Sequence, residues 1–396
     1  MEMNLHILLP ILLVIAKLVG VLCRKVGVPA VVGEILAGIL LGPAVFGLLP
    51  ASGSEIAGFN VFEEFAQIGL CVLLFRIGLE TDMQEFFRVW KSATSVAILG
   101  MVLPFMFGMV VSYALGWSMT VSAFIGATLT ATSIGVTASV LEEINGLSSA
   151  EGRIILGAAV LDDVFGLILL AAMVALTVQG ESVIGPVSRS LVFASLFIAG
   201  GIYIGPWLVK GFMKLTRWAN QPSVLLVLAF AYLLVMASTA HAIGLAMIIG
   251  AYAAGLAFGG HPEHEQLNRD LRPLIDLITP LFFILIGASI VFAGFNPLTD
   301  AGRSAWGLFL VILTAAVAGK LLCPILITGN SNRLAIGSGM MPRGEVGFVF
   351  AQVGLSVGVF KPNAYSVLTL VLVATTILGP LLLRLVWKNK PTKKTT

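Results

Sequence analysis

The hydrophobic pattern divides the chain into long apolar stretches separated by short polar segments. A transmembrane helix needs roughly 20 mainly apolar residues. Measured against that length, the pattern predicts thirteen spans, several of them interrupted by glycine or proline. They cover residues 4–23, 29–48, 61–79, 91–116, 119–142, 151–179, 186–214, 222–239, 242–260, 271–293, 303–328, 333–357 and 363–386. We therefore expect an all-α polytopic membrane protein.

Lysine and arginine residues fall unevenly between these spans. An odd number of spans places the termini on opposite sides, and basic residues concentrate on the cytoplasmic side. The side of the membrane opposite the C-terminus carries only Arg189, Arg303 and Lys361. The C-terminal side collects Arg24, Lys25, Arg76, Arg88, Lys91, Arg153, Lys210, Lys214, Arg217, Arg269, Arg272, Arg333, Arg384, Lys388, Lys390, Lys393 and Lys394. This asymmetry predicts a multi-pass protein of the inner (plasma) membrane, N-terminus outside and C-terminus inside.

The composition agrees with a lipid environment. Of 396 residues, 58% are hydrophobic and 11% are charged, against roughly 25% charged in soluble domains. The net charge of +3 is too small to indicate a nucleic-acid partner. Cys23, Cys71 and Cys323 have neither metal-ligand nor disulfide spacing. We expect no cofactor.

Thirteen spans divide as six, one and six. Two six-helix units separated by one span insert with opposite topology, as in inverted-repeat transporters. The second span, "VVGEILAGILLGP", resembles the ninth, "LAMIIGAYAAGLAFG". We predict one transporter domain over 1–396, with repeat one at about 1–180 and repeat two at about 222–386. A linker helix at about 186–214 lies between the repeats, and a basic tail, 387–396, follows them.

The fifth and twelfth spans are interrupted at equivalent positions. The fifth reads "GATLTATSIGVTASV", and the twelfth reads "GSGMMPRGEVGFVFAQVG". Unwound backbone at membrane depth is tolerated where protein or a water-filled cavity receives it. Paired discontinuous helices are the best sequence indicator of a transporter's binding site. Glycine, serine and threonine also favour close packing of membrane helices, which is the structural alternative.

Ionisable residues within spans are rare and usually functional. Lys17 lies near the end of its span and can reach the interface. Glu34 is either a structural hydrogen-bond acceptor or an accessory site. Arg343 and Glu345, in the interrupted twelfth span, can offset each other or the half-helix ends.

Asp162, Asp163 and Lys320 form the most informative set. Adjacent residues on a helix point about 100° apart, so the two carboxylates face different partners. Lys320 is isolated in an apolar span and needs a carboxylate. One aspartate is then left over near the membrane midplane.

The remaining carboxylate can bind either a proton or a hard monovalent cation, and the two ions compete for it. Competition at one site that opens alternately to each side is sufficient for exchange. The hydroxyls of Thr130, Thr132 and Ser133, with nearby unwound carbonyls, are candidates to complete the oxygen shell of a cation bound to Asp163.

Five motifs occur in order along the chain: "GEILAGILLGP", "LLFRIGLETD", "TLTATSIGVTASVL", "AAVLDDVFGLI" and "MPRGEVGFV". In these the chain resembles bacterial monovalent cation:proton antiporters, especially sodium/proton antiporters with two adjacent aspartates. The resemblance implies Asp163 as the essential ion-binding residue and Asp162 as the partner of Lys320. It also implies crossed discontinuous helices, and a homodimer with a dimerisation domain and a mobile core. The chain lacks a G-x-G-x-x-G motif, unlike relatives gated through a nucleotide-binding domain.

The sequence thus predicts an electrogenic Na⁺/H⁺ antiporter that works by alternating access and is not an enzyme. Its expected partners are Na⁺ (with Li⁺ or K⁺ as alternatives), H⁺, the lipid bilayer and a second copy of the chain. A K⁺(Na⁺)/H⁺ antiporter of the same fold is the main alternative. A channel or an organic-solute/sodium symporter is a more distant one.

Overall fold

The computed structural model describes residues 5–50, 59–81, 83–175, 184–259, 261, 263–289, 299–328 and 331–387. Throughout these ranges the regular secondary structure is helical. The helices are α1 (Leu5–Lys25), α2 (Ala30–Leu41), α3 (Phe59–Glu80), α4 (Met83–Ala114), α5 (Met119–Thr128), α6 (Ile134–Glu143), α7 (Ala150–Ala175), α8 (Ile184–Tyr203), α9 (Gly205–Ala219), α10 (Pro222–Ala242), α11 (Met247–Phe258), α12 (His264–Ala288), α13 (Asp300–Leu322), the 3₁₀ helix η1 (Cys323–Leu326), α14 (Arg333–Gly339), α15 (Glu345–Ser356) and α16 (Pro362–Val386).

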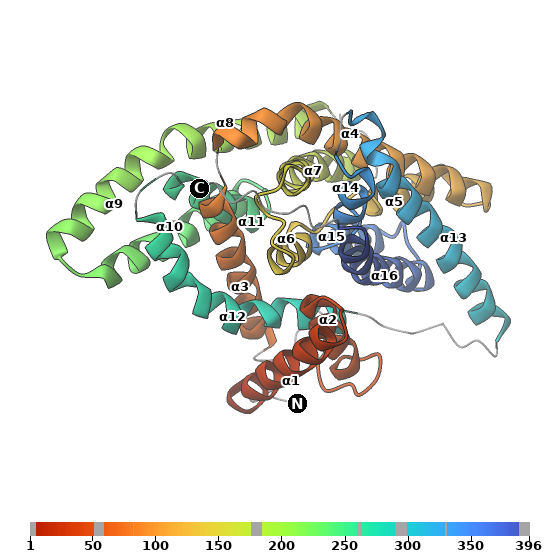
Figure 1. Ribbon diagram of the computed structural model, residues 1–396. Coiled ribbons are helices and arrows are strands. Elements are labelled where there is room, and N and C mark those ends of the chain that lie inside the picture. The colour runs from red at the N-terminus through yellow and green to blue at the C-terminus, as the bar shows by residue number, and fades with distance from the viewer. Residues whose placement is uncertain are drawn as a thin grey trace.

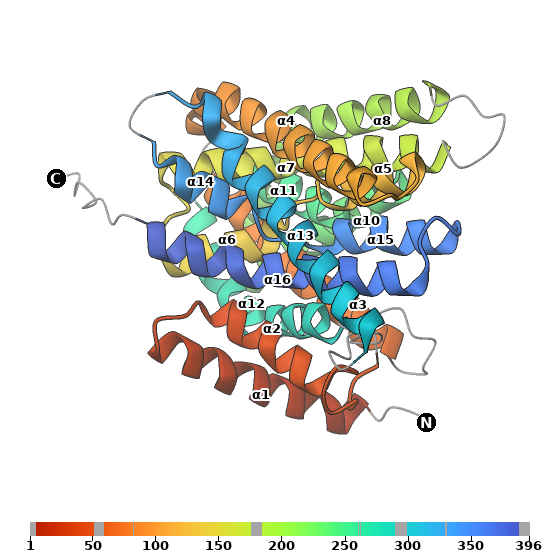
Figure 2. The same cartoon turned by 90° about the vertical axis from the view of Figure 1, so that its right-hand side faces the viewer.

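Several helices match a membrane in length and apolar character. Among the described residues, six are long enough: Arg88–Ala114, Ser195–Ala219, Ser223–Ala242, His264–Ala288, Arg303–Leu326 and Asn363–Val386. Four shorter apolar helices accompany them: Ala30–Leu41, Met119–Thr128, Met247–Phe258 and Val346–Ser356. The chain is therefore a multi-pass membrane protein. The start of α1 and the end of α16 lie at opposite ends of the bundle (Figure 2).

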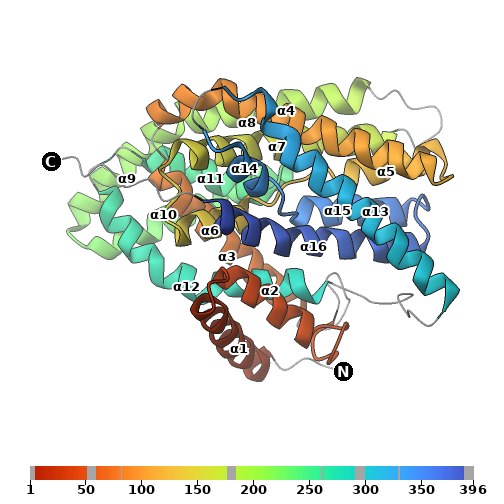
Figure 3. The same ribbon diagram turned by 45° about the vertical axis from the view of Figure 1, so that its right-hand side comes forward.

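The helices gather into two bundles. The first bundle contains α1–α3 and α10–α12, and the second contains α4–α7 and α13–α16. Figures 1 and 3 show α1, α2 and α12 on one side, apart from α4, α5 and α13 on the other. Helices α8 and α9 follow one flank and connect α7 to α10 (Figure 1). This division decides which contacts join the candidate site to the rest of the protein.

Glycines bring the helices of the first bundle close together. A Cβ on Gly38 of α2 would overlap the Ile284 carbonyl of α12, and one on Gly255 of α11 would overlap the Phe75 carbonyl of α3. Close approach through small residues is the usual way that membrane helices associate. The motifs "GEILAG" and "GAYAAG", one in each half of the chain, thus each provide a glycine at a close helix–helix contact.

The helical path is interrupted twice in the second bundle. Residues 129–133 separate α5 from α6, and residues 340–344 separate α14 from α15. The Ser133 hydroxyl accepts a hydrogen bond from the Val136 N–H at 3.4 Å and so caps the start of α6. Capping by serine satisfies a backbone donor that would otherwise be exposed at the helix end. Both interruptions therefore bring non-helical backbone into the protein interior.

Candidate functional site

The two interruptions contact each other directly. The Ser133 N–H donates to the Pro342 carbonyl at 2.7 Å. The Thr137 hydroxyl donates to the Gly339 carbonyl at 2.6 Å, and the Thr132 hydroxyl lies 3.3 Å from the Met340 carbonyl. Donors near the start of α6 thereby satisfy carbonyls at the end of α14, which have no helical partner of their own.

Lys320 and Asp162 form a buried ion pair beside this junction. The Lys320 Nζ of α13 donates to Asp162 Oδ2 at 3.1 Å and to the Thr132 hydroxyl at 2.7 Å. The two charged side chains are 0% and 1% exposed. Since an unpaired buried ammonium is very costly, the contact accounts for one of the two adjacent aspartates.

Asp163 faces the first bundle. It lines a cavity of about 10 Å³ together with Thr132, Ser133 and Gly344. The apolar wall includes Leu70 of α3, Ile248 of α11 and Phe282 of α12, all from the first bundle. This volume is on the scale of one water molecule or one small ion. The carboxylate therefore lies at the boundary between the bundles, in a space that fits a monatomic ligand.

Arg343 donates hydrogen bonds to backbone carbonyls of the interrupted segment after α5 and of α13. This fully buried guanidinium donates to the carbonyls of Ala131 at 2.8 Å, Ala316 at 3.3 Å and Thr130 at 3.4 Å. Its positive charge offsets the partial negative charge at the end of α5. Glu345 is the first residue of α15, and its side chain lies outside the described part of the structure.

The predicted hydroxyl donors have separate positions. Thr132 and Ser133 line the cavity beside Asp163, whereas Thr130 is absent from its lining. The Thr130 hydroxyl donates to the Ala127 carbonyl at 2.8 Å. Thr132 and Ser133 are thus brought to Asp163, and Thr130 supports the local backbone.

Glu34 lies in the first bundle, away from this junction. It lines a cavity of about 590 Å³ with Arg24, Arg76, Arg272 and Arg384. We call this part of the protein the Arg-rich end, where α1, α6 and α16 end and α2 begins. Lys17 also lines the cavity and lies 3.6 Å from Asp276.

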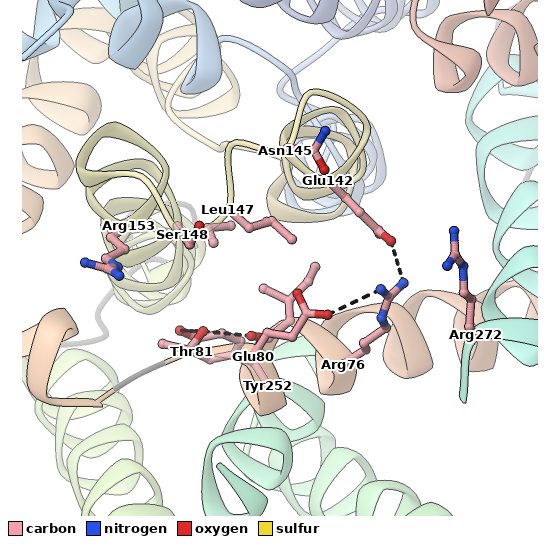
Figure 4. Close-up of a pocket in the computed structure, with 12 residues that line it drawn as sticks. Arg76, Glu80, Thr81, Glu142, Asn145, Leu147, Ser148, Arg153, Tyr252 and Arg272 are labelled. Carbon is pink, nitrogen blue, oxygen red and sulfur yellow. Dashed lines mark hydrogen bonds and ion pairs between the residues drawn. The ribbon is translucent and has the colours of Figure 1, made fainter. Parts of the chain in front are cut away.

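The sequence analysis did not select Glu142 and Glu143, at the end of α6. Glu142 pairs with Arg76 of α3, which also bonds Glu80, beside a second cavity of about 370 Å³ (Figure 4). The Glu143 carboxylate accepts from Arg384 and from the Ala30 N–H, each at 2.9 Å. The sequence signal that could have indicated them is the acidic pair in "VLEEING", at the end of the interrupted fifth span.

Comparison with known proteins identifies the family. Residues 11–389 match the family described as sodium/hydrogen exchanger, transmembrane. The chain is 35% identical to the high-affinity Na⁺/H⁺ antiporter NhaS3 of Synechocystis, over 94% of this chain and 88% of that protein. It is 31% identical to the Na⁺/H⁺-K⁺ antiporter GerN of Bacillus cereus, over 97% and 96% of the two chains.

The fold also resembles solved structures. The sodium proton antiporter MjNhaP1 of Methanocaldococcus jannaschii matches with a TM-score of 0.73 in one structure and 0.65 in another. Sequence identity is 17% and 18%, and at least 96% of each chain is covered. The likeness at this identity concerns the fold alone. On the family match and the similarity to NhaS3, the chain belongs to the sodium/hydrogen exchanger family.

Proposed function

We propose that this protein is a secondary active antiporter that exchanges Na⁺ for H⁺, with both ions competing for Asp163. The main support is the cavity of about 10 Å³ beside Asp163, which residues of both bundles line. NhaS3 and GerN, which match most of the chain, are Na⁺/H⁺ antiporters by name. Transport of this kind is not an enzymatic reaction.

The chemistry follows from the carboxylate. When ionised, Asp163 supplies the charge that a hard monovalent cation requires, and Ser133 and Thr132 offer nearby hydroxyl oxygens. When protonated, the same carboxyl group no longer attracts the cation. Because Asp163 lies at the boundary between the bundles, a displacement of the second bundle against the first would expose it to one side and then the other. Alternating exposure with competition gives coupled exchange.

Lys320 makes the exchange electrogenic in this proposal. A cation bound at Asp163 also draws on Asp162 and Thr132, both of which contact the Lys320 ammonium. The freed ammonium then gives up a proton. One Na⁺ would replace two protons, one on Asp163 and one on Lys320, and each cycle would move net charge.

The proposal also covers the number of spans, their crossing and the relation between the two halves of the chain. We take the fifth and twelfth spans as crossed discontinuous helices within thirteen spans, and the halves 1–180 and 222–386 as inverted repeats joined by the helix at 186–214. Support comes from the equivalent glycine packing of α2 on α12 and of α11 on α3. The protein would be a homodimer in the inner membrane, N-terminus outside and C-terminus inside, with the basic tail 387–396 in the cytoplasm.

K⁺ is the alternative cation, since GerN is named as a Na⁺/H⁺-K⁺ antiporter. An organic-solute symporter fits poorly, because pockets for organic ligands usually measure ≈ 300–1,000 Å³, far above the 10 Å³ at Asp163. A channel has no need for the carboxylate pair.

The test is transport by the purified protein in liposomes that contain a pH-sensitive dye. Na⁺, Li⁺ and K⁺ are added in turn to the external solution. Proton efflux with Na⁺ and a weaker response with K⁺ is expected. Cation flux without coupled proton movement would contradict antiport, and a K⁺ response equal to that of Na⁺ would favour the alternative.

A further inference from the structure

Thr376 of α16 bonds both backbone polar groups of Arg343, in the interruption between α14 and α15. Its hydroxyl accepts from the Arg343 N–H at 3.1 Å and lies 2.6 Å from the Arg343 carbonyl. The Leu372 carbonyl lies equally close to this hydroxyl, but within a helix it already accepts from a backbone N–H. The hydroxyl proton is therefore available to Arg343. Buried backbone groups outside a helix need such a partner, and here α16 supplies it.

One face of α16 lies along the interrupted segment (Figure 3). Leu372, Thr376 and Gly379 follow one another at spacings of four and three residues, which places them on the same side of the helix. A Cβ on Gly379 would lie 2.6 Å from Pro342 Cδ. A Cβ on Gly347, in the first turn of α15, would lie 3.0 Å from Leu372 Cδ2. Thr376 makes its polar contact between these two close approaches.

The segment held by α16 forms one wall of the cavity beside Asp163. The Pro342 carbonyl accepts from the Ser133 N–H at 2.7 Å. Gly344 lines the cavity, and a Cβ on it would lie 2.8 Å from the Ser133 hydroxyl oxygen. The residues on both sides of Arg343 thus contact Ser133, which also lines the cavity. A shift of the Arg343 backbone would therefore move the Ser133 oxygen relative to Asp163.

The size of the cavity makes such a shift important. Its volume of about 10 Å³ is on the scale of one monatomic ligand. Selection between cations depends on the size of the site, on the number of its ligands and on their flexibility. A loosened wall would hold a small cation less tightly and would discriminate less against a larger one.

We propose that Thr376 is a positioning residue that sets the affinity and selectivity of the cation site by fixing the Arg343 backbone. Thr376 touches no ion and acts through Arg343 on Ser133 and Gly344. The inference rests on the proposed function, in which the cation binds at Asp163. Without the hydroxyl, the backbone groups of Arg343 lose their partner, and the segment moves to satisfy them elsewhere. The KM for Na⁺ then rises and the preference for Na⁺ over K⁺ falls, whereas the rate at saturating Na⁺ changes little.

The adjacent threonine provides a matched control. Thr375 is as fully buried as Thr376, and its hydroxyl bonds the carbonyls of Val371 and Leu372 in its own helix, at 3.0 and 2.8 Å. Thr375→Val and Thr376→Val replace the same hydroxyl by a methyl group in the same helix. Only the second change removes a contact with the interruption. Thr376→Ser keeps the hydroxyl and should therefore behave like the unsubstituted protein.

Hydrogen exchange at the Ser133 amide tests the position of the wall without any transport. In the full-length protein in detergent, this amide should exchange roughly tenfold faster in Thr376→Val, which is the scale of one lost hydrogen bond. Thr375→Val and Thr376→Ser should match the unsubstituted protein. Unchanged exchange in Thr376→Val would overturn the proposal. If that variant does not fold, Thr376→Cys replaces it, because a thiol is a weaker hydrogen-bonding group and should give the same change at smaller amplitude.

Transport is the second readout, measured as pH-dye flux over a range of Na⁺ and K⁺ concentrations. Thr376→Val should raise the KM for Na⁺ roughly tenfold, equivalent to about 1.4 kcal/mol, and increase the K⁺ response relative to that of Na⁺. A lower rate with unchanged KM and ion preference would indicate a merely structural role and overturn the proposal, as would equal changes in Thr375→Val. Absence of sodium-coupled flux in the unsubstituted protein would contradict the antiport proposal, and the exchange arm would still decide whether Thr376 positions the wall.

Discussion

Lys320 and Asp162 form an ion pair in the interior of the second bundle, with the Nζ of one 3.1 Å from the Oδ2 of the other and almost no exposure of either side chain. The Thr132 hydroxyl also accepts from the ammonium, at 2.7 Å. The pair thereby fixes α7, α13 and the interrupted segment after α5 against one another. Asp163, the next residue, is left to face the first bundle.

Removing one partner of this pair should destabilise the protein. Asp162→Asn leaves the Lys320 ammonium without its carboxylate, and breaking a buried pair in this way typically costs about 3–5 kcal/mol. The thermal midpoint in detergent should fall clearly. Lys17→Gln is the matched control, because Lys17 and Asp276 are 56% and 62% exposed, and such surface pairs contribute about 0–1 kcal/mol. Equal midpoints for the two variants would show that the pair is not needed for stability.

The proton on Lys320 accounts for net charge movement in the proposed cycle. Lys320→Gln cannot carry a proton, so any remaining exchange should be electroneutral. Sodium-driven current on a solid-supported membrane and dye-reported flux should be measured on the same liposomes. Retention of the unsubstituted protein's current per sodium ion would assign Lys320 a purely structural role. Lys17→Gln again serves as the control and should keep its current.

Membrane orientation has a direct chemical test. Lys361 precedes α16, and Lys390 follows its end, so one span separates the two positions. A cysteine at Lys361 should react with an impermeant thiol reagent added outside, and a cysteine at Lys390 only after the reagent reaches the inside. The single-cysteine proteins are made in a background without Cys23, Cys71 and Cys323. Reaction of both from the same side would invalidate the predicted span count.

The sequence was sufficient to predict those features of the site that depend on residues close together in the chain. Two adjacent aspartates on one helix must face different partners, and the structure places Asp162 on Lys320 and Asp163 at the boundary cavity. The glycine and hydroxyl residues of the fifth span and the proline and glycine of the twelfth correspond to the gaps between α5 and α6 and between α14 and α15. The different surroundings of the two aspartates and the two interruptions follow from neighbouring residues alone, whereas the assignment of Asp162 to Lys320, 158 residues away, came from the resemblance to cation:proton antiporters.

Other parts of the site depend on contacts that no spacing reveals. Non-helical backbone has no fixed period, so the sequence could not separate Thr130, which bonds Ala127, from Ser133, which lines the cavity. Arg343 has Glu345 nearby in sequence, yet its guanidinium donates to carbonyls more than 200 residues away, at Thr130 and Ala131. The cap that Glu143 places on Ala30 joins residues 113 positions apart and was missed for the same reason.

The central claim is that Asp163 carries the exchanged ions. Asp163→Asn should fold, because the amide has nearly the same shape and the Lys320–Asp162 pair is unchanged. It should exchange nothing, because an amide neither binds a proton nor neutralises a cation. Asp270→Asn, an exposed aspartate of α12, is the matched control and should transport normally.

The decisive measurement is sodium-driven, pH-dye flux through equal amounts of the unsubstituted protein, Asp163→Asn and Asp270→Asn in the same liposomes. We expect flux by Asp163→Asn to be indistinguishable from that of empty liposomes, with a thermal midpoint close to that of the unsubstituted protein. Sodium-coupled proton flux at the unsubstituted rate in Asp163→Asn would contradict the assignment of the ion-binding carboxylate.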